Sequence, residues 1–489
     1  MRQDNPEQLG ETSAREMLHW IEEIVKFGVR RPGYPGNLAT EEYLFERFSE
    51  FGLLDIEKEP VPTNCWKPER LTLAIGEARD TIPCIGIPYT RWTPLEGIEA
   101  ESVYVGEGKP EDLEGVHLEG KIVIFDARFG ELSAAMLKQG ASDVYDPDQN
   151  IPDGPLHAAN WLITNFTSYY HFQVQGAAAV VGLLVDSPID GCSYYVPYDG
   201  YLKDLPAVWI GRDRANEVRE AAQSKSMFHL TAIGKTPRME THNIVGVVPG
   251  EGEEAILLTS HHDGPFASAV EDGSGLAVLL ALARHFGALP GELERSLIFV
   301  ASSGHFHGGI GNRVFVDRHK KDWLPKIAAA LGVEHIANEV EEDGKGGYRL
   351  TGLPETRAIF TEGGPLPELI AEGVRKWNLD RSITVPPYLF GPEPPCDSAP
   401  YFTAGIPSSC LISGPLYLFD EFDTIDKVRS EDLENVLSFY IELIERIDKV
   451  PMEELERDLT RGRNDAPADP PHWFLPPEFF LKSLREAKG

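Results

Sequence analysis

One stretch, residues 255–285, limits the fold of this chain more than any other. It begins with a short apolar run, AILLT, which is flanked by glycine and glutamate as expected of a buried strand. The run leads into His-His-Asp at 261–263, and a loop then carries Glu-Asp at 271–272 into Gly-Ser-Gly. Leucine and alanine follow at helical spacing. Histidines and carboxylates therefore gather where a strand ends and a helix begins, as in the ligand sites of open α/β sheets.

These residue types fit a metal site, but each also has an ordinary structural role. Imidazole and carboxylate groups are suitable ligands for zinc or a similar divalent ion. A histidine at a strand end can instead be hydrogen-bonded in the core, and an acidic residue before glycine can cap a helix. For Asp272 both roles stay open, as helix cap or as a metal ligand in place of Glu271. The stretch alone does not decide between a metal site and a structural cluster.

Length and charge limit the classes of protein that the chain can belong to. At 489 residues, two or three domains are expected rather than one. The formal net charge of −33 argues against nucleic acid and anionic membranes as partners, because both repel an acidic surface. No apolar run reaches about 18 residues, so no membrane-spanning helix is expected.

The cysteines and the first residues bear on the compartment. The five cysteines are scattered and lack CxxC spacing, which fits reduced thiols better than a disulfide framework or a thiolate metal site. The first twenty residues lack the basic and apolar regions of a signal peptide. We therefore expect a cytoplasmic protein.

The predicted secondary structure differs between two parts of the chain. Residues 66–238 contain short strand-like runs between Gly/Pro turns, and an irregular, aromatic-rich segment at 128–172 that either packs in the core or forms a lid. From residue 239 strands and helices alternate. The expected strands are 243–248, 254–260, 296–302, 327–336 and 408–413, and the expected helices are 14–28, 39–52, 274–288, 366–378 and 430–447.

This alternation predicts an α/β fold, a doubly wound mixed sheet with helices on both faces. We expect it to be formed by residues 1–65 and 239–449, with residues 66–238 inserted as a mostly β domain. Residues 450–489 form a C-terminal extension with an apolar end. That extension is expected to pack on its own chain or on a partner subunit, which leaves a homo-oligomer open.

Several motifs, in the right order, resemble the M28 family of zinc aminopeptidases and their relatives. They are Arg30–Gly36, Asn243–Gly250, His261–Asp263, Glu271–Gly275, Gly405–Pro407 and Asp423-Thr424. Within the insert, Gly120–Val123 and Gly176–Val181 resemble the protease-associated domain of many members. The resemblance implies a zinc-exopeptidase-like sheet and a metal-dependent hydrolase.

The resemblance also implies roles for particular residues. Such enzymes usually hold two zinc ions, and the matching ligands of the first ion are His261, Glu271 and, at a later strand end, Glu334. Asp263 matches the acid that orients the ligating histidine, which fixes its tautomer and raises its basicity. His305 stands at the position of the general base, and imidazole is suited to that work.

The second ion's own ligands are absent. Both of their positions are phenylalanine, Phe306 and Phe419, whereas all three positions of the first ion can bind metal. We therefore expect one divalent metal, zinc, with three protein ligands and an open fourth position, as in catalytic sites. The phenylalanines make the pocket apolar, which suits an aliphatic or aromatic small molecule or a peptide-like substrate.

Three other histidines lie near these positions. On a strand, His335 faces away from Glu334 and His262 faces away from His261, so packing is the expected role of both. His307 stays open as an extra ligand.

Three functions remain open on the sequence. The first is a single-metal hydrolase that cleaves an amide or similar bond. The others are a metal-dependent lyase or acyl-transfer enzyme on the same scaffold, and a metal-free binding protein without catalysis.

Overall fold

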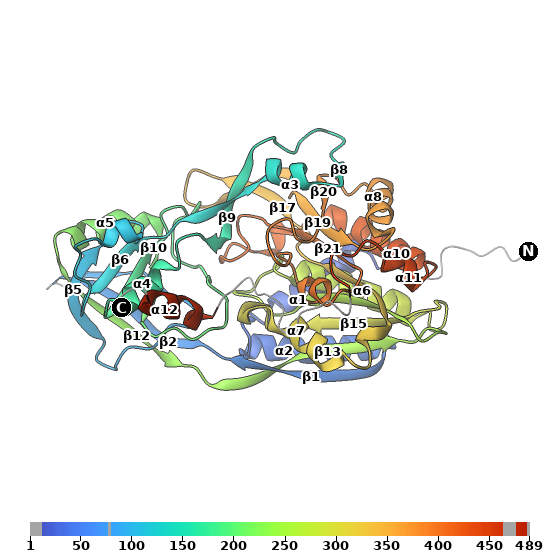
Figure 1. Ribbon diagram of the computed structural model, residues 1–489, viewed down its shortest axis with the longest axis horizontal. Helices are drawn as coiled ribbons and strands as arrows, with labels where there is room; N and C mark the ends of the chain where they lie inside the picture. Colours follow the sequence, from blue (N-terminus) through green and yellow to red (C-terminus); the bar gives the residue numbers. More distant parts are fainter. Residues whose placement is uncertain (1–11, 77–79, 463–475, 487–489) are drawn as a thin grey trace, which may run out of the picture.

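The computed structural model describes residues 12–76, 80–462 and 476–486. Its body is a nine-stranded sheet next to a smaller, β-rich unit (Figure 1). The order of the large sheet is β1 (Leu54–Asn64), β13 (Arg238–Val248), β15 (Ser296–Ser302), β14 (Ala255–His261), β16 (Ile327–Val333), β21 (Ser408–Ser413), β19 (Arg357–Glu362), β20 (Ser382–Val385) and β8 (Asp143–Tyr145).

The four central strands β15, β14, β16 and β21 are parallel, and the strands beyond them bring in antiparallel pairs. This confirms the predicted mixed α/β sheet. Parallel strands are buried on both faces, which explains why β14 reads as a continuous apolar run. Ile256 and Leu258 of β14 belong to one core cluster, and Ala255 and Leu257 belong to another on the opposite face.

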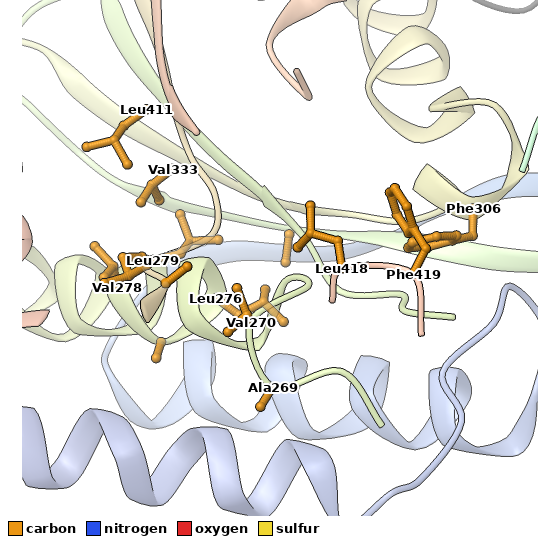
Figure 2. Packing of buried hydrophobic residues seen from close by; sticks show 14 of the residues in the cluster. Ala269, Val270, Leu276, Val278, Leu279, Phe306, Val333, Leu411, Leu418 and Phe419 are labelled. Atoms are coloured by element: carbon orange, nitrogen blue, oxygen red, sulfur yellow. The ribbon is translucent and has the colours of Figure 1, made fainter. Parts of the chain in front are cut away.

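Helices cover both faces of the sheet, as a doubly wound fold requires. The α6 side of the sheet carries α1 (Ala14–Val25), α2 (Pro35–Glu50), α6 (Gly273–Gly287) and α10 (Leu433–Ile447). The opposite face carries α7 (Ile310–His319) and α9 (Ala399–Thr403). Figure 2 shows α6 leucines packed toward Val333 and Leu411, on the central strands β16 and β21. The helix α8 (Leu366–Lys376) lies against β19 and β20.

The smaller unit is built around an eight-stranded sheet. Its order is β3 (Asp80–Ile82), β2 (Lys67–Ile75), β12 (Met227–Lys235), β5 (Ile98–Tyr104), β6 (Ile122–Asp126), β10 (Ala179–Leu183), β11 (Ala207–Ile210) and β4 (Ile85–Gly86), with α5 (Arg212–Gln223) packed against β5. Strand β1 of the large sheet continues into β2 of the smaller unit, and β12 of the smaller unit continues into β13 of the large sheet. The antiparallel pairs β1–β13 and β2–β12 therefore join the two units (Figure 1).

The segment 128–172, expected to be irregular, is regular over most of its length. It contains β7 (Phe129–Ser133), α3 (Ala134–Gly140), β8, β9 (Pro155–Ile163) and the start of α4 (Ser168–Val174). β8 pairs with β20 and so forms the edge of the large sheet, although the sequence assigned it to the insert. The rings of Tyr169, Tyr170 and Phe172 are buried, so these residues take the core-packing role of the two that the sequence left open.

The C-terminal extension returns to the insert of its own chain. The helix α12 (Pro477–Glu486) lies on α4, and the Phe480 ring stacks on Tyr170 with centroids 5.0 Å apart. The prolines and aromatics of 470–475 lie outside the described residues. Each helix in the described ranges is too short or too polar to serve as a membrane span.

Candidate metal centre

The predicted site residues lie at the carboxyl ends of the central parallel strands. His261 is the last residue of β14, His305 follows β15 by three residues, and Glu334 follows β16 directly. In an open α/β sheet the strand ends meet at one edge, where ligands bind. The loop between β14 and α6 adds Glu271 to the same edge. All four side chains are buried or nearly so, and the most exposed of them is His305 at 15%.

Three imidazole rings converge on the carboxylate of Glu271. The Nε2 atom of His261 lies 3.0 Å from Oε1, and the Nε2 atom of His335 lies 2.6 Å from Oε2. The Nε2 atom of His305 lies 3.7 Å from Oε1. The His261 and His305 rings are stacked, with centroids 4.1 Å apart. Glu271 is therefore the centre of the site.

The other ring nitrogen of each histidine has its own partner. Nδ1 of His261 lies 2.9 Å from the main-chain oxygen of Asp263, and Nδ1 of His335 lies 2.6 Å from that of Ser413. Nδ1 of His305 lies 2.9 Å from Oδ1 of Asp397. Because a carbonyl oxygen can only accept, Nδ1 of His261 and of His335 carries the proton. Their Nε2 atoms are left to act as ligands, which is the usual arrangement of a metal-binding histidine.

The donor set of His261, Glu271 and His335 fits a divalent ion. Their ligand atoms all lie within 4.8 Å of one another. Within the described part of the chain, neither Nε2 atom and neither Glu271 oxygen has a partner with hydrogen-bond geometry, despite the short distances. Buried polar atoms without partners are costly, and one cation among them would satisfy all four. Two imidazoles and one carboxylate with an open fourth position is a known catalytic zinc arrangement.

The excess of buried negative charge at this edge of the sheet also favours a bound cation. Arg30 contributes a fully buried guanidinium, but buried carboxylates outnumber it: Asp263, Glu271, Asp272, Glu334, Asp397 and Asp423. Burial raises the pKa of Glu271, but His335 and His261 outweigh it and hold that pKa well below its usual range. Burial lowers the pKa of His335, and the charge of Glu271 more than compensates, raising it to about 9. A proton on His335 therefore neutralises Glu271 when no metal does.

The structure places Glu334, the predicted third ligand, in a neighbouring group. Its Oε1 atom accepts hydrogen bonds from the Asp397 amide at 2.8 Å and from the Cys410 thiol at 3.0 Å. His335 stands beside Glu271 in its place. The prediction that His335 packs away from the site is wrong, because β16 ends at Val333 and His335 has a φ of 55°. The alternation of a strand no longer applies there.

Asp263 orients its neighbours differently from the expectation. Its main-chain oxygen, not its carboxylate, accepts from Nδ1 of His261, and the nearer carboxylate oxygen is 3.9 Å from that nitrogen. The carboxylate accepts instead from the amides of His305 and Phe306, at 3.1 and 2.8 Å. Asp263 thus ties the end of β14 to the turn that presents His305.

The remaining alternatives lie outside the centre. The Asp272 side chain caps α6 by accepting from the Gly275 amide. His262 faces away from His261, with its ring nitrogens beside the Asn37 side chain and the His242 carbonyl. His307 accepts from the Asn64 amide through Nε2.

The half of the site beyond His305 is aromatic. The rings of Phe306 and Phe419 meet edge to face with centroids 5.5 Å apart, and Figure 2 shows them side by side. Tyr198, from the insert, lies 5.3 and 5.2 Å from these two rings and stacks on His305 at 5.4 Å. The two phenylalanine positions singled out in the sequence therefore meet in space, and a residue of the insert covers them.

Three residues that position the site were not assigned roles from the sequence. Arg30 donates to the main-chain oxygens of His262 and Ser268, and the Asp423 carboxylate accepts from the Glu271 amide at 2.9 Å. Both lie in motifs noted for their resemblance alone, Arg30–Gly36 and Asp423-Thr424. Asp397 lies in none of those motifs, and its carboxylate fixes His305.

Comparison with known proteins agrees with this architecture. Residues 243–353 match the family model of Peptidase family M28. Carboxypeptidase Q of Xenopus laevis is 24% identical over 342 residues, which cover 67% of this chain and 65% of that protein. Carboxypeptidase Q of Bos taurus is 23% identical over 314 residues, covering 60% and 59%. The matched region thus spans less than two thirds of the length of these two relatives.

Solved structures show the same fold. A zinc aminopeptidase from Bacillus subtilis superposes with a TM-score of 0.66 at 16% identity, covering 93% of this chain and all of that one. An aminopeptidase from Aneurinibacillus sp. strain AM-1 gives a TM-score of 0.61 at 20% identity, covering 89% and 94%.

Proposed function

Because its α/β domain is that of the M28 peptidases, we propose that this protein is a metal-dependent hydrolase that cleaves an amide bond in a peptide or peptide-like substrate. The metal is one divalent ion, zinc, held by His261, Glu271 and His335. The Bacillus subtilis structure that shares the fold is named a zinc aminopeptidase, which supports the choice of ion.

One observation carries the proposal. The Nε2 atoms of His261 and His335 both face the Glu271 carboxylate, their Nδ1 atoms are fixed by carbonyl oxygens, and the facing atoms lack hydrogen-bond partners in the described chain. A merely structural cluster of buried polar groups would be expected to satisfy its hydrogen bonds. Here the unsatisfied atoms are metal ligands aimed at one point.

The residues around the centre suit hydrolysis. A divalent ion held by these residues would supply a Lewis acid for the substrate carbonyl. His305 lies next to Glu271 as the general base that takes a proton from the attacking water, and it is the one centre residue with a partly exposed side chain, at 15%. Asp397 holds the ring through Nδ1, so that Nε2 receives the proton. This is the logic of an aspartate–histidine pair.

The aromatic half supports a single ion and an apolar substrate group. Phe306 and Phe419 are buried and offer no ligand atoms, and with Tyr198 they form a continuous apolar wall beside His305. We therefore propose that this wall binds an aliphatic or aromatic side chain of the substrate. We also keep the cytoplasmic location, which the five free cysteines support. Whether the chain forms a homo-oligomer stays a prediction.

The experiment pairs two adjacent histidines. A panel of dipeptides and N-blocked dipeptides is incubated with the purified protein before and after chelation, and again after zinc is restored. His261→Ala should abolish hydrolysis and zinc rescue, whereas His262→Ala, whose ring lies outside the centre, should keep both. Hydrolysis that survives chelation, or that is lost equally in both variants at equal stability, would refute the proposal.

A further inference from the structure

Behind the Glu271 centre lies a second buried group of ligand-type side chains. Glu334, Cys396 and Cys410 bring a carboxylate oxygen and two sulfur atoms within 4.8 Å of one another. Cys410 is part of β21, Glu334 follows β16, and Cys396 lies three residues before α9. The fold brings these residues together from three segments. The cysteines therefore have no CxxC spacing, and the sequence predicted no thiolate site.

The group is enclosed but not satisfied. Glu334 and Cys410 are fully buried, and Sγ of Cys410 lies 3.0 Å from Oε1 of Glu334. The Oε2 atom of Glu334 has no hydrogen-bond partner in the described part of the chain. Burying a carboxylate oxygen without a hydrogen-bond partner costs free energy, so this atom marks a position where a ligand could bind.

The backbone leaves room for these groups at Gly332, on β16. A β-carbon at that position would lie 2.7 Å from Sγ of Cys410 and 2.3 Å from Oγ of Ser398. Any side chain there would displace the thiol. Both cysteines are free thiols, and Cys410 is buried whereas the Cys396 residue is partly buried.

We propose that Glu334, Cys396 and Cys410 form a second metal site, for a thiophilic divalent ion such as zinc. Two thiolates, one carboxylate and an open fourth position make a tetrahedral set that zinc accepts. As each sulfur–metal bond forms, its thiol releases one proton to solvent. A tetrahedral ion with ordinary Zn–S and Zn–O bond lengths holds its S and O ligand atoms about 3.6 Å apart, so the present arrangement needs only a small opening.

This site would brace the proposed general base. Asp397 follows Cys396 directly in the chain, its amide donates to Glu334, and its carboxylate holds Nδ1 of His305. A metal that fixes Cys396 and Glu334 therefore fixes the backbone on the amide side of Asp397. The site itself does not depend on the hydrolase assignment, because its ligands are separate from His261, Glu271 and His335.

The test uses Co²⁺ as the probe, because cobalt–thiolate bonds give a sulfur-to-metal charge-transfer band that imidazole and carboxylate ligands do not. The reduced full-length protein is titrated with Co²⁺ alongside Cys396→Ser, Cys410→Ser and the control Cys192→Ser, a partly buried cysteine outside the group. We expect two equivalents and the band in the unmodified protein and in the control. Each of the other two variants should bind one equivalent less and lose the band.

His261→Ala separates this proposal from the function proposed above. It should lose one equivalent of Co²⁺ and keep the charge-transfer band. A band that is absent from the folded unmodified protein, or that persists in Cys396→Ser, would overturn the second site. So would a disulfide between Cys396 and Cys410, located by peptide mapping, in the protein purified without reductant. Circular dichroism checks that each variant is folded. If Cys410→Ser does not fold, the result for Cys396→Ser, whose position is partly buried, decides the test.

Discussion

Asp397→Asn tests whether His305 works as a base held by a carboxylate. The Asp397 Oδ1 atom lies 2.9 Å from Nδ1 of His305, and its Oδ2 atom accepts from Ser302 at 3.3 Å. Burial raises the pKa of Asp397, but His261 and His305 outweigh it and lower that pKa, so the carboxylate is ionised. Asparagine keeps the shape and removes the charge. It can also present its NH₂ group to Nδ1, which would reverse the tautomer of His305.

The expected loss follows from the bond that is removed. A hydrogen bond to a charged group contributes about 1.5–3 kcal/mol, and each 1.36 kcal/mol is tenfold in rate, so kcat should fall about 10- to 150-fold. Because Asp397 positions the base and does not hold the substrate in this account, KM should change little. The metal content should also stay the same, since Asp397 is not among the three ligands of the Glu271 centre.

The assay is hydrolysis of the best dipeptide from the panel, with kcat and KM measured over a range of pH. The matched control is Glu59→Gln, which neutralises another buried carboxylate paired with a histidine, His319, at 2.6 Å and outside the site. The control should keep its kcat. A fall in kcat of less than about threefold for Asp397→Asn would contradict the reasoning, since it corresponds to under 1 kcal/mol. An equal fall in the control would do the same.

Three further predictions concern stability. Phe306→Ala empties a fully buried aromatic position and should lower the free energy of unfolding by about 3–5 kcal/mol in denaturant titrations; a loss below about 1 kcal/mol would mean that the aromatic wall is not packed. Burial lowers the pKa of His319, but Glu59 outweighs it and raises that pKa, so the pair stabilises fully below about pH 6.5 and less as pH rises through the raised value. The stability difference between the unmodified protein and Glu59→Gln should therefore shrink from pH 6 to pH 9, and a difference that grows would refute the pairing. Chelation should lower the melting temperature of the unmodified protein by more than that of His261→Ala, because the ion lost only from the unmodified protein contributes about 2.7 kcal/mol at about 100 times its Kd.

Much of the fold could be predicted because its signals are local. The apolar run of β14 and the leucine spacing of α6 gave both elements to within one residue of their ends. The proximity of His261 and Glu271 could be predicted for the same reason, because His261 ends a strand and Glu271 lies just before the start of the next helix. The edge strand β8 was not predicted, because its three residues pair with β20, more than two hundred residues later, and carry no pattern of their own.

The site residues that were missed depend on geometry that a pattern does not contain. Whether His335 faces the site depends on where β16 stops, and three residues of error there reversed its predicted direction. Glu334 was predicted to be a ligand of the Glu271 centre, but its carboxylate contacts Cys410 instead. The grouping of Glu334, Cys396 and Cys410 comes from three segments that meet only in the folded protein.

The central claim is that one ion is bound at Glu271, and anomalous diffraction at the metal edge from crystals of the zinc-loaded protein tests it most directly. We expect one anomalous peak at this centre, within about 2.0–2.2 Å of Nε2 of His261, Nε2 of His335 and the Glu271 carboxylate. No peak should lie between Phe306 and Phe419. Two ions on either side of Glu271, or one ion bound by Glu334 with His335 turned away, would contradict it.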